Sequence, residues 1–188
     1  CLGVLLELKK IGLAPTRGFR LIFTSDLPTS VGLSSSAALE LATAHTLLQL
    51  SGHSLSKEEM VRVCRRAEND FVGMPCGILD QGTSAFGKEG HLVCIECERE
   101  NFCNLSLPHG TGVWVFNTGI KHDLVDSLYS TRHRECLDVF ESIKATHPAR
   151  NFLCECTMDD LSTMDLAENL RKRATHVIKE QERVTSFC

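Results

Sequence analysis

The stretch that decides the fold is Pro28-Thr-Ser-Val-Gly-Leu-Ser-Ser-Ser-Ala-Ala38, in which a predicted strand gives way to a predicted helix. Three consecutive hydroxyl residues, Ser34, Ser35 and Ser36, follow closely on Gly32. Serine favours a helix N-cap because its oxygen accepts a hydrogen bond from an unpaired backbone N–H. One cap uses one hydroxyl, so the others are either solvated or available to an anion at the positive end of the helix dipole. The stretch therefore predicts a helix start and leaves open an ordinary cap or a phosphate site.

The composition is that of an ordinary globular chain, with 43% hydrophobic residues, 23% charged residues and a net charge of −4 over 188 residues. This mild acidity gives no electrostatic reason to expect nucleic acid or an anionic membrane as a partner. The apolar runs fall short of the roughly 20 residues that a membrane span needs. Glu7, Lys9 and Lys10 also interrupt the apolar start, which is untypical of a signal peptide. We therefore expect no nucleic-acid partner, no membrane partner and a cytoplasmic location.

Ten cysteines are unusual for a chain of this kind. Most lie in apolar periodic segments, where a free thiol behaves as a small hydrophobic side chain, and a disulfide framework is not expected. Cys94-Ile-Glu-Cys97 has the spacing of a zinc site, but no second well-spaced pair completes four ligands. The overlapping run His91–Glu96 is more typical of a strand. Structural zinc is therefore the weaker interpretation.

Hydrophobic periodicity predicts an α+β fold. Helices are expected over 2–11, from the serine run to Gly52, from Ser56, from Asp123 and from Asp165, and strands over 19–24, 91–96, 104–107 and 112–116. Ser56 and Glu59 form a capping box, and Gly52 is typical of a helix C-terminus. The expected buried face of the helix after Asp123 is Leu124, Leu128, Cys136, Val139, Phe140 and Ile143. Short links between the later strands favour a mostly antiparallel sheet.

A second stretch, Met74-Pro-Cys-Gly-Ile-Leu-Asp-Gln81, is rich in helix breakers and presents one carboxylate, that of Asp80, at its end. Glu68 lies one turn beyond Cys64 at the edge of an apolar stripe, so spacing alone favours a solvated flank residue. Phosphoryl transfer requires positioning, charge neutralisation and a group that orients or deprotonates the acceptor hydroxyl. We hypothesise that N–H groups at Ser34–Ser36 hold phosphates, that a serine hydroxyl and Glu68 bind a metal, and that Asp80 accepts the proton.

The run Gly32-Leu-Ser-Ser-Ser-Ala37 resembles the phosphate-binding motif of the GHMP small-molecule kinases. Within that family, Ala67-Glu68 and the run Phe71-Val-Gly-Met-Pro-Cys-Gly-Ile-Leu-Asp-Gln81 resemble the galactokinases. The likeness continues in order through Asn117-Thr-Gly-Ile-Lys-His122, Ser127-Leu-Tyr129, Arg132-His-Arg-Glu-Cys136 and Arg173-Ala-Thr-His-Val-Ile178. It covers nearly the whole chain, so it is far more specific than one short motif.

The resemblance implies an ATP- and Mg²⁺-dependent enzyme that phosphorylates the C1 hydroxyl of D-galactose. The residues that it places at the ATP phosphates are Gly32, Leu33, Ser34, Ser35, Ser36 and Ala37. It implies that Ser36 and Glu68 bind Mg²⁺ and that Asp80 is the catalytic aspartate. Gly77, Asp80 and Tyr129 match positions that contact the sugar, although periodicity alone favours packing for Tyr129.

Three departures from the family pattern affect these expectations. The sugar-binding signature that opens galactokinases is absent, and so is their C-terminal glycine-rich motif. The family also has glycine where this chain has Thr29-Ser30-Val31, and β-branched Val31 does not easily adopt a positive φ. An arginine that would offset the charge of the transferring phosphate is missing with the opening signature. We therefore expect an internal piece of a galactokinase, with slow or no phosphate transfer on its own.

The resemblance implies a two-domain kinase with its site in the cleft between the domains. Residues 1–110 would belong to the N-terminal, ATP-binding domain, and residues 111–188 to the end of that domain and the start of the C-terminal one. Two alternatives stay open: a related kinase for arabinose, galacturonate or N-acetylgalactosamine, and a non-catalytic galactose sensor. A protein partner is expected only for the sensor. The uninterrupted Gly-Leu-Ser-Ser-Ser-Ala run favours a kinase.

Overall fold

The structure is a computed structural model that describes residues 1–29, 31–119 and 129–187. The chain divides into two compact units, Cys1–Val125 and Asp126–Cys188. Each unit has its own hydrophobic core.

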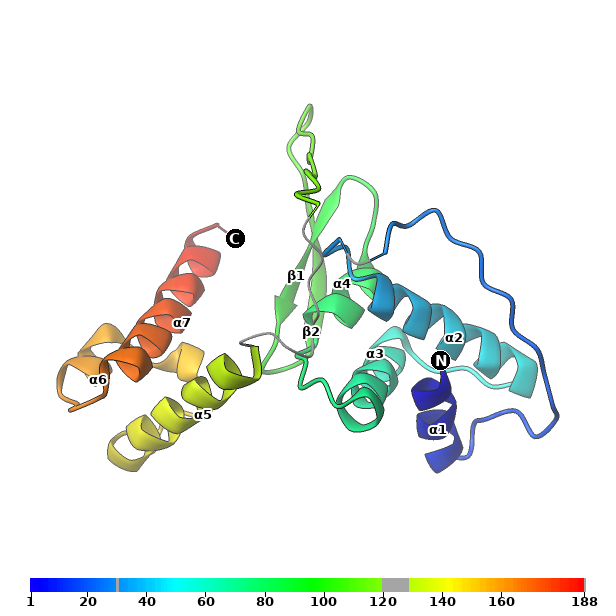
Figure 1. Cartoon of the computed structure of the whole chain (residues 1–188). Helices are drawn as coiled ribbons and strands as arrows, with labels where there is room; N and C mark the ends of the chain where they lie inside the picture. The colour runs from blue at the N-terminus through cyan, green and yellow to red at the C-terminus, as the bar shows by residue number, and fades with distance from the viewer. Residues whose placement is uncertain (30, 120–128, 188) are drawn as a thin grey trace. The chain divides into compact units, whose positions relative to one another are not determined.

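The first unit combines helices with one β-hairpin (Figure 1). Its elements are α1 (Leu2–Lys10), α2 (Ser35–Ser51), α3 (Lys57–Arg66), the π-helix η1 (Ala67–Val72), α4 (Leu79–Phe86), β1 (His91–Glu96) and β2 (Asn101–Ser106). The strands pair antiparallel, with His91 opposite Ser106 and Glu96 opposite Asn101. The α+β class expected from the sequence is confirmed, and so is the antiparallel pairing.

The core of this unit lies between α1, α2 and α3. Its buried side chains are Val4, Leu8, Ala44, Leu47, Leu48, Val63, Cys64 and Ala67. The predicted capping box starts α3, because the Ser56 hydroxyl accepts from the Glu59 N–H (3.2 Å) and the Glu59 carboxylate accepts from the Ser56 N–H (2.8 Å). Gly52 ends α2 at a φ of +73°, a conformation that glycine adopts without a steric penalty. Both helix-boundary predictions are confirmed.

The hairpin packs against α4 because glycine occupies position 82. A Cβ atom there would lie 2.5 Å from the Phe102 ring and 3.2 Å from Ile95. The Phe102 ring in turn stacks on Phe86, with ring centroids 4.3 Å apart. The close approach of α4 and the hairpin thus depends on the absence of a side chain at Gly82.

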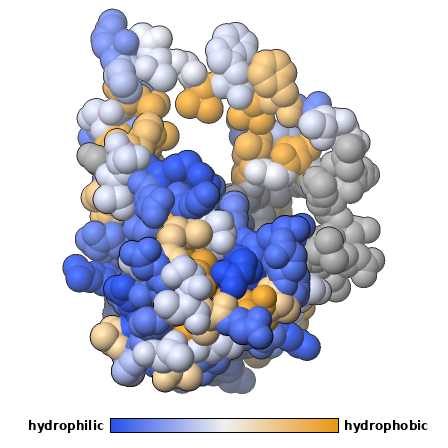
Figure 2. Space-filling view, turned by 90° about the vertical axis from the view of Figure 1, so that its left-hand side faces the viewer, coloured by the Kyte–Doolittle hydropathy of each residue, from blue (hydrophilic) through white to orange (hydrophobic). Residues whose placement is uncertain are grey.

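Two of the predicted strands do not form among the described residues. Residues 19–24 and 112–116 are irregular, and Ile22, Trp114 and Phe116 are more than 80% exposed. A strand requires a neighbour that accepts and donates its backbone hydrogen bonds, and no described segment pairs with either stretch. Their apolar side chains add to the hydrophobic surface of the chain, part of which Figure 2 shows in orange.

The second unit is helical in its described part. It contains α5 (Tyr129–Thr146), the 3₁₀ turn η2 (Leu153–Glu155), α6 (Met158–Ser162) and α7 (Glu168–Phe187). Its core is Val139, Ile143, Cys156, Leu161, Ala174 and Ile178. Arg173 of α7 donates to the Glu135 carboxylate of α5 at 2.7 Å. The last helix begins three residues beyond the predicted Asp165 cap.

Some predictions fall outside the described residues. The predicted cap Asp123 and the predicted buried residues Leu124 and Leu128 belong to 120–128, which the structure does not describe. The remaining members of that predicted face lie on α5, where Val139 and Ile143 are fully buried. Across 1–29, 31–119 and 129–187, no helix combines the length and apolar character of a membrane span.

The contact at Gly82 predicts a specific loss of stability. In Gly82→Ala the new methyl group would displace Phe102 from its stack on Phe86, so we expect a destabilisation of about 1–3 kcal/mol. Gly18→Ala is the matched control, because a Cβ there meets nothing within 4 Å. Urea unfolding of the two variants measures the difference, and equal stabilities would contradict this packing of α4 against the hairpin.

Candidate active site

The serine-rich turn and Asp80 are brought together although 46 positions separate them in the chain. Ser34, the N-cap of α2, has a left-handed backbone (φ 51°, ψ 37°), and its side chain makes no capping hydrogen bond. Its hydroxyl instead donates to a carboxylate oxygen of Asp80 at 2.9 Å. The N-terminus of α2 and the first turn of α4 therefore meet at one point.

The other predicted phosphate-binding residues adjoin Ser34 in the chain. Gly32 has a φ of +75° and is exposed, as is Leu33. Ser35 and Ser36 are the first two residues of α2. The next residue, Ala37, is fully buried. A helix N-terminus presents unpaired N–H groups and the positive end of the dipole. The geometry is therefore suited to an anion beside Asp80.

The helix breakers around Asp80 suggest a loop, but Asp80 lies in a helix. Helix α4 begins at Leu79 and places Asp80 in its first turn. Gly77 is exposed in the preceding loop. Tyr129, the third predicted sugar contact, is the first residue of α5 in the second unit, where its ring stacks on His133.

Glu68 is buried, which corrects the expectation of a solvated flank residue. It lies on η1 and is 7% exposed. The π-helical turn widens the helix, a feature that is frequent at functional sites. The neighbouring Asn69 side chain accepts from the backbone N–H of Cys76 at 2.8 Å. Since the Met74 N–H also donates to the Glu68 carbonyl, the loop before α4 is tied back to η1.

A buried amide joins Glu68 to a second acidic residue. Gln81, which follows Asp80 on α4, is completely buried. Its Nε2 lies 2.6 Å from the Glu68 carboxylate and 3.1 Å from that of Glu40 on α2. Sequence reasoning missed Glu40 and Gln81. The available signal was the position of Glu40, a charged residue on the same helical face as Ala37 and Ala44.

Burial raises the pKa of two groups here, the Glu40 carboxyl and the Cys76 thiol. Desolvation raises the pKa of Glu40 to about 7, against the hydrogen bond from Gln81, and the charges of Glu68 and Asp80 raise it further. Desolvation and the neighbouring Glu68 raise the pKa of the Cys76 thiol to about 12. The thiol therefore stays protonated near neutral pH and acts as a hydrogen-bond donor.

The predicted magnesium ligands supply the oxygen donors that this ion prefers. In the described part of the chain, no group of three or more His, Cys, Asp or Glu side chains forms a metal site by itself. Magnesium, however, is usually held by one or two protein oxygens together with phosphates and water. Glu68 accepts hydrogen bonds at Oε2 from Gln81 and Cys76, and no described residue donates to its Oε1. In their chemistry, one carboxylate oxygen of Glu68 and the Ser36 hydroxyl are ligands of the kind that the predicted ion takes.

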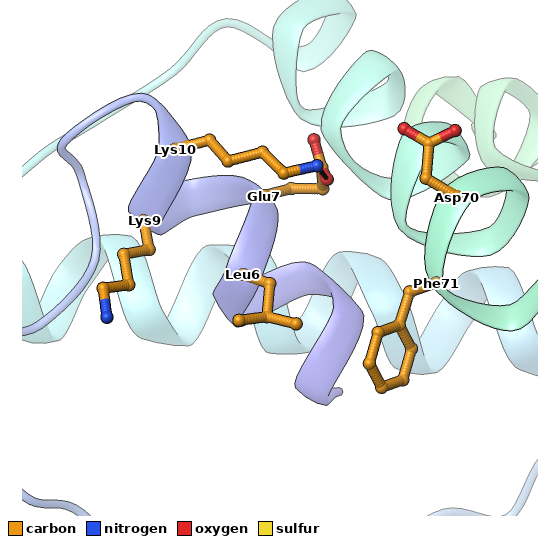
Figure 3. A pocket seen from close by; sticks show the side chains of 6 residues that line it. All are labelled: Leu6, Glu7, Lys9, Lys10, Asp70 and Phe71. Atoms are coloured by element: carbon orange, nitrogen blue, oxygen red, sulfur yellow. Dashed lines mark hydrogen bonds and ion pairs between the residues drawn. The ribbon is translucent and has the colours of Figure 1, made fainter.

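A separate pocket of about 430 Å³ lies between α1 and η1 (Figure 3). Its lining residues are Leu6, Glu7, Lys9, Lys10, Asp70 and Phe71. Although burial opposes ionisation, hydrogen bonds from Lys10 and Arg66 hold the pKa of Glu7 below its ordinary value. The Glu7 carboxylate in this pocket is thus already paired with cations of the protein. None of the predicted site residues lines it.

Comparison with known proteins agrees with the motifs. Residues 1–88 match the family model of the GHMP kinases N terminal domain. Galactokinase from Thermotoga maritima is 37% identical over 174 residues, which cover 89% of this chain and 48% of that protein. Galactokinase from Roseiflexus sp. is 36% identical over 183 residues, covering 96% of this chain and 46% of that protein.

The fold also matches a solved structure, that of Lactococcus lactis galactokinase complexed with galactose. The TM-score is 0.82 at 29% sequence identity, and the match covers 97% of this chain and 48% of the other. The GHMP kinase likeness thus lies in residues 1–88, and the likeness in fold extends over most of the chain. The chain is similar to galactokinases over most of its length, and it spans about half the length of the curated relatives it matches.

The Ser34–Asp80 contact predicts a measurable contribution to stability. Ser34→Ala removes a hydrogen bond to a charged acceptor, so we expect a loss of about 1.5 kcal/mol in the free energy of unfolding. Ser35→Ala, one position further on, should change it by less than about 0.5 kcal/mol. In an Asp80→Ala background the Ser34→Ala loss should largely disappear. An undiminished loss in that background would contradict the contact.

The raised pKa of Glu40 predicts a pH-dependent stability. Folded Glu40 keeps its proton to a pH of about 7, whereas in the unfolded chain it releases it near the ordinary value of 4.5. The unfolded state thus binds fewer protons in this window, and stability falls as pH rises through it. Relative to Glu40→Gln, the wild type should lose about 3 kcal/mol between pH 4.5 and pH 7. Urea unfolding across this range tests it, and a constant difference would refute it.

Proposed function

We propose that this chain carries the phosphate-binding helix and the catalytic aspartate of a galactokinase, which transfers the γ-phosphate of ATP to the C1 hydroxyl of D-galactose. The observation that carries the proposal is the Ser34–Asp80 hydrogen bond. It brings a carboxylate next to a helix N-terminus, so a phosphate held there would lie beside the group that receives the acceptor's proton. Relatives that are galactokinases support the choice of sugar.

Asp80 has one oxygen available for this role. Its Oδ1 accepts from Ser34, and among the described residues nothing donates to its Oδ2. In the proposed reaction Oδ2 takes the proton of the C1 hydroxyl as that oxygen bonds to the γ-phosphorus. The bond from the γ-phosphorus to the bridging oxygen breaks, and ADP leaves. Ser34 fixes the rotation of the carboxylate during this step.

The remaining residues hold the substrates in the proposal. The first-turn N–H groups of α2 and the residues 32–37 would bind the phosphates. Ser36 and Glu68 would hold Mg²⁺, which neutralises charge on the phosphates when bound. Gly77 and Tyr129 would contact the sugar, as their counterparts in the family pattern imply. The cytoplasmic location expected from the composition is part of the same proposal.

The catalytic role of Asp80 is tested by ADP release. The protein is expressed from its complete reading frame and assayed with ATP, Mg²⁺ and D-galactose in a coupled assay. Asp80→Asn should lower the rate by about 10²–10⁴-fold because the amide cannot accept the proton. Asp70→Asn, an exposed acid-to-amide change on η1, is the matched control and should retain activity.

The same assay separates the competing functions. Turnover of arabinose, galacturonate or N-acetylgalactosamine in preference to galactose would replace the proposed acceptor. Galactose and ATP binding without ADP release would favour the sensor. Full activity of Asp80→Asn would show that Asp80 is not the proton acceptor.

A further inference from the structure

Gln81 connects three elements of the first unit through one buried nitrogen. Its Nε2 lies within hydrogen-bond distance of Glu68 on η1 and of Glu40 on α2, while the residue itself belongs to α4. A primary amide nitrogen carries two hydrogens. Both are used here, one for each carboxylate. The side chain cannot turn away from one acidic partner without losing the other.

The orientation of this amide is fixed at an energetic cost. The Gln81 Oε1 is buried and has no hydrogen-bond partner among the described residues. Buried acceptors are rarely left unpaired. The reverse orientation would face an amide oxygen toward two carboxylates, so repulsion excludes it as long as either is ionised. The nitrogen is therefore held toward Glu68 even though the oxygen goes unsatisfied.

This arrangement determines which oxygen of Glu68 is available. Gln81 donates to Oε2 at 2.6 Å. The Cys76 thiol lies 3.4 Å from the same atom and 3.2 Å from Asn69 Oδ1, so its single hydrogen is shared between these two acceptors. In the described part of the chain, Oε1 receives no hydrogen bond. The carboxylate is thus anchored through one oxygen and presents the other to a ligand.

We propose that Gln81 is a positioning residue for the magnesium site, an inference that rests on the proposed function. It orients the Glu68 carboxylate so that Oε1 is the metal-binding atom, and Glu40 keeps the amide from rotating by accepting its second hydrogen. Outer partners of metal ligands typically change metal affinity by 10–100-fold when they are replaced. Gln81 would act on the ion without touching it.

The test measures how much Mg²⁺ strengthens nucleotide binding to the 188-residue chain. Isothermal titration with AMP-PNP, a non-hydrolysable ATP analogue, gives a Kd in EDTA and a Kd in excess Mg²⁺, and their ratio is the magnesium increment. In Gln81→Met, which retains the side-chain volume but has no amide, the increment should fall about tenfold or more. The Kd in EDTA should change by less than about twofold. A merely structural role would weaken binding in both conditions.

Matched variants complete the design. Gln49→Met makes the same change on an exposed face of α2 and should leave the increment unchanged. Glu68→Gln should lose the increment, and adding Gln81→Met to it should cause no further loss. If Gln81→Met does not fold, Gln81→Asn keeps the amide but is too short to reach both carboxylates. It should also lose the increment.

The outcomes distinguish this inference from the proposed function. An unchanged increment in Gln81→Met or Gln81→Asn, with a loss in Glu68→Gln, overturns the positioning role alone. An unchanged increment in Glu68→Gln shows that Glu68 is not a metal ligand. If Mg²⁺ does not strengthen AMP-PNP binding to the wild type, Glu68 is likewise not a metal ligand. Either of these last results ends the proposed metal site and this inference together.

Discussion

The buried amide of Gln81 is the constraint on which the geometry of the candidate site depends. Successive residues of an α-helix project about 100° apart, so the direction of Gln81 fixes the direction of Asp80. Because Gln81 must reach two buried carboxylates, helix α4 has one rotational setting. In that setting Asp80 meets Ser34 at the start of α2. Packing of the hairpin at Gly82 is a further contact on the same helix.

The site concentrates negative charge and compensates it only in part. Glu40, Glu68 and Asp80 lie near enough that the last two raise the pKa of the first. Three neutral donors, the Gln81 amide, the Cys76 thiol and the Ser34 hydroxyl, stabilise these carboxyl groups without adding positive charge. A triphosphate brought to such a place would increase the repulsion. A divalent cation between the carboxylates and the phosphates would reverse it, which is the physical reason for expecting one here.

Local signals in the sequence predicted more of the fold than long-range ones. The capping box at Ser56 and the end of α2 at Gly52 depend on neighbours within a few residues, and both are confirmed. The strands expected over 19–24 and 112–116 require a partner from elsewhere in the chain, and periodicity does not say whether one is present. The first turn of α4 was not predicted, because Pro75 and Gly77 are helix breakers and lie just before the residue where the helix begins.

The same distinction applies to the site. Motif resemblance selected Ser34 and Asp80, and the fold places them in contact, but spacing alone assigned Glu68 to a solvated edge. Its burial follows from the π-helical turn and from Gln81, and neither has a signature in hydrophobic periodicity. Glu40 offered a weak signal as a charge on a buried helical face. Its partner could be known only once α2 and α4 were placed side by side.

The backbone of Ser34 ties the local strain of the turn to the proposed phosphate site. A left-handed conformation is unfavourable for serine by about 1–2 kcal/mol, and an N-cap serine normally recovers stability by bonding the first turn of its helix. Ser34 instead directs its hydroxyl to Asp80 and makes no capping bond. The N–H groups at the start of α2 are consequently left without a side-chain partner from their own cap. Strain of this kind persists where the surrounding structure imposes it, and it is often found at functional sites. A bound phosphate would provide oxygen acceptors for the N–H groups that the Ser34 side chain does not cap.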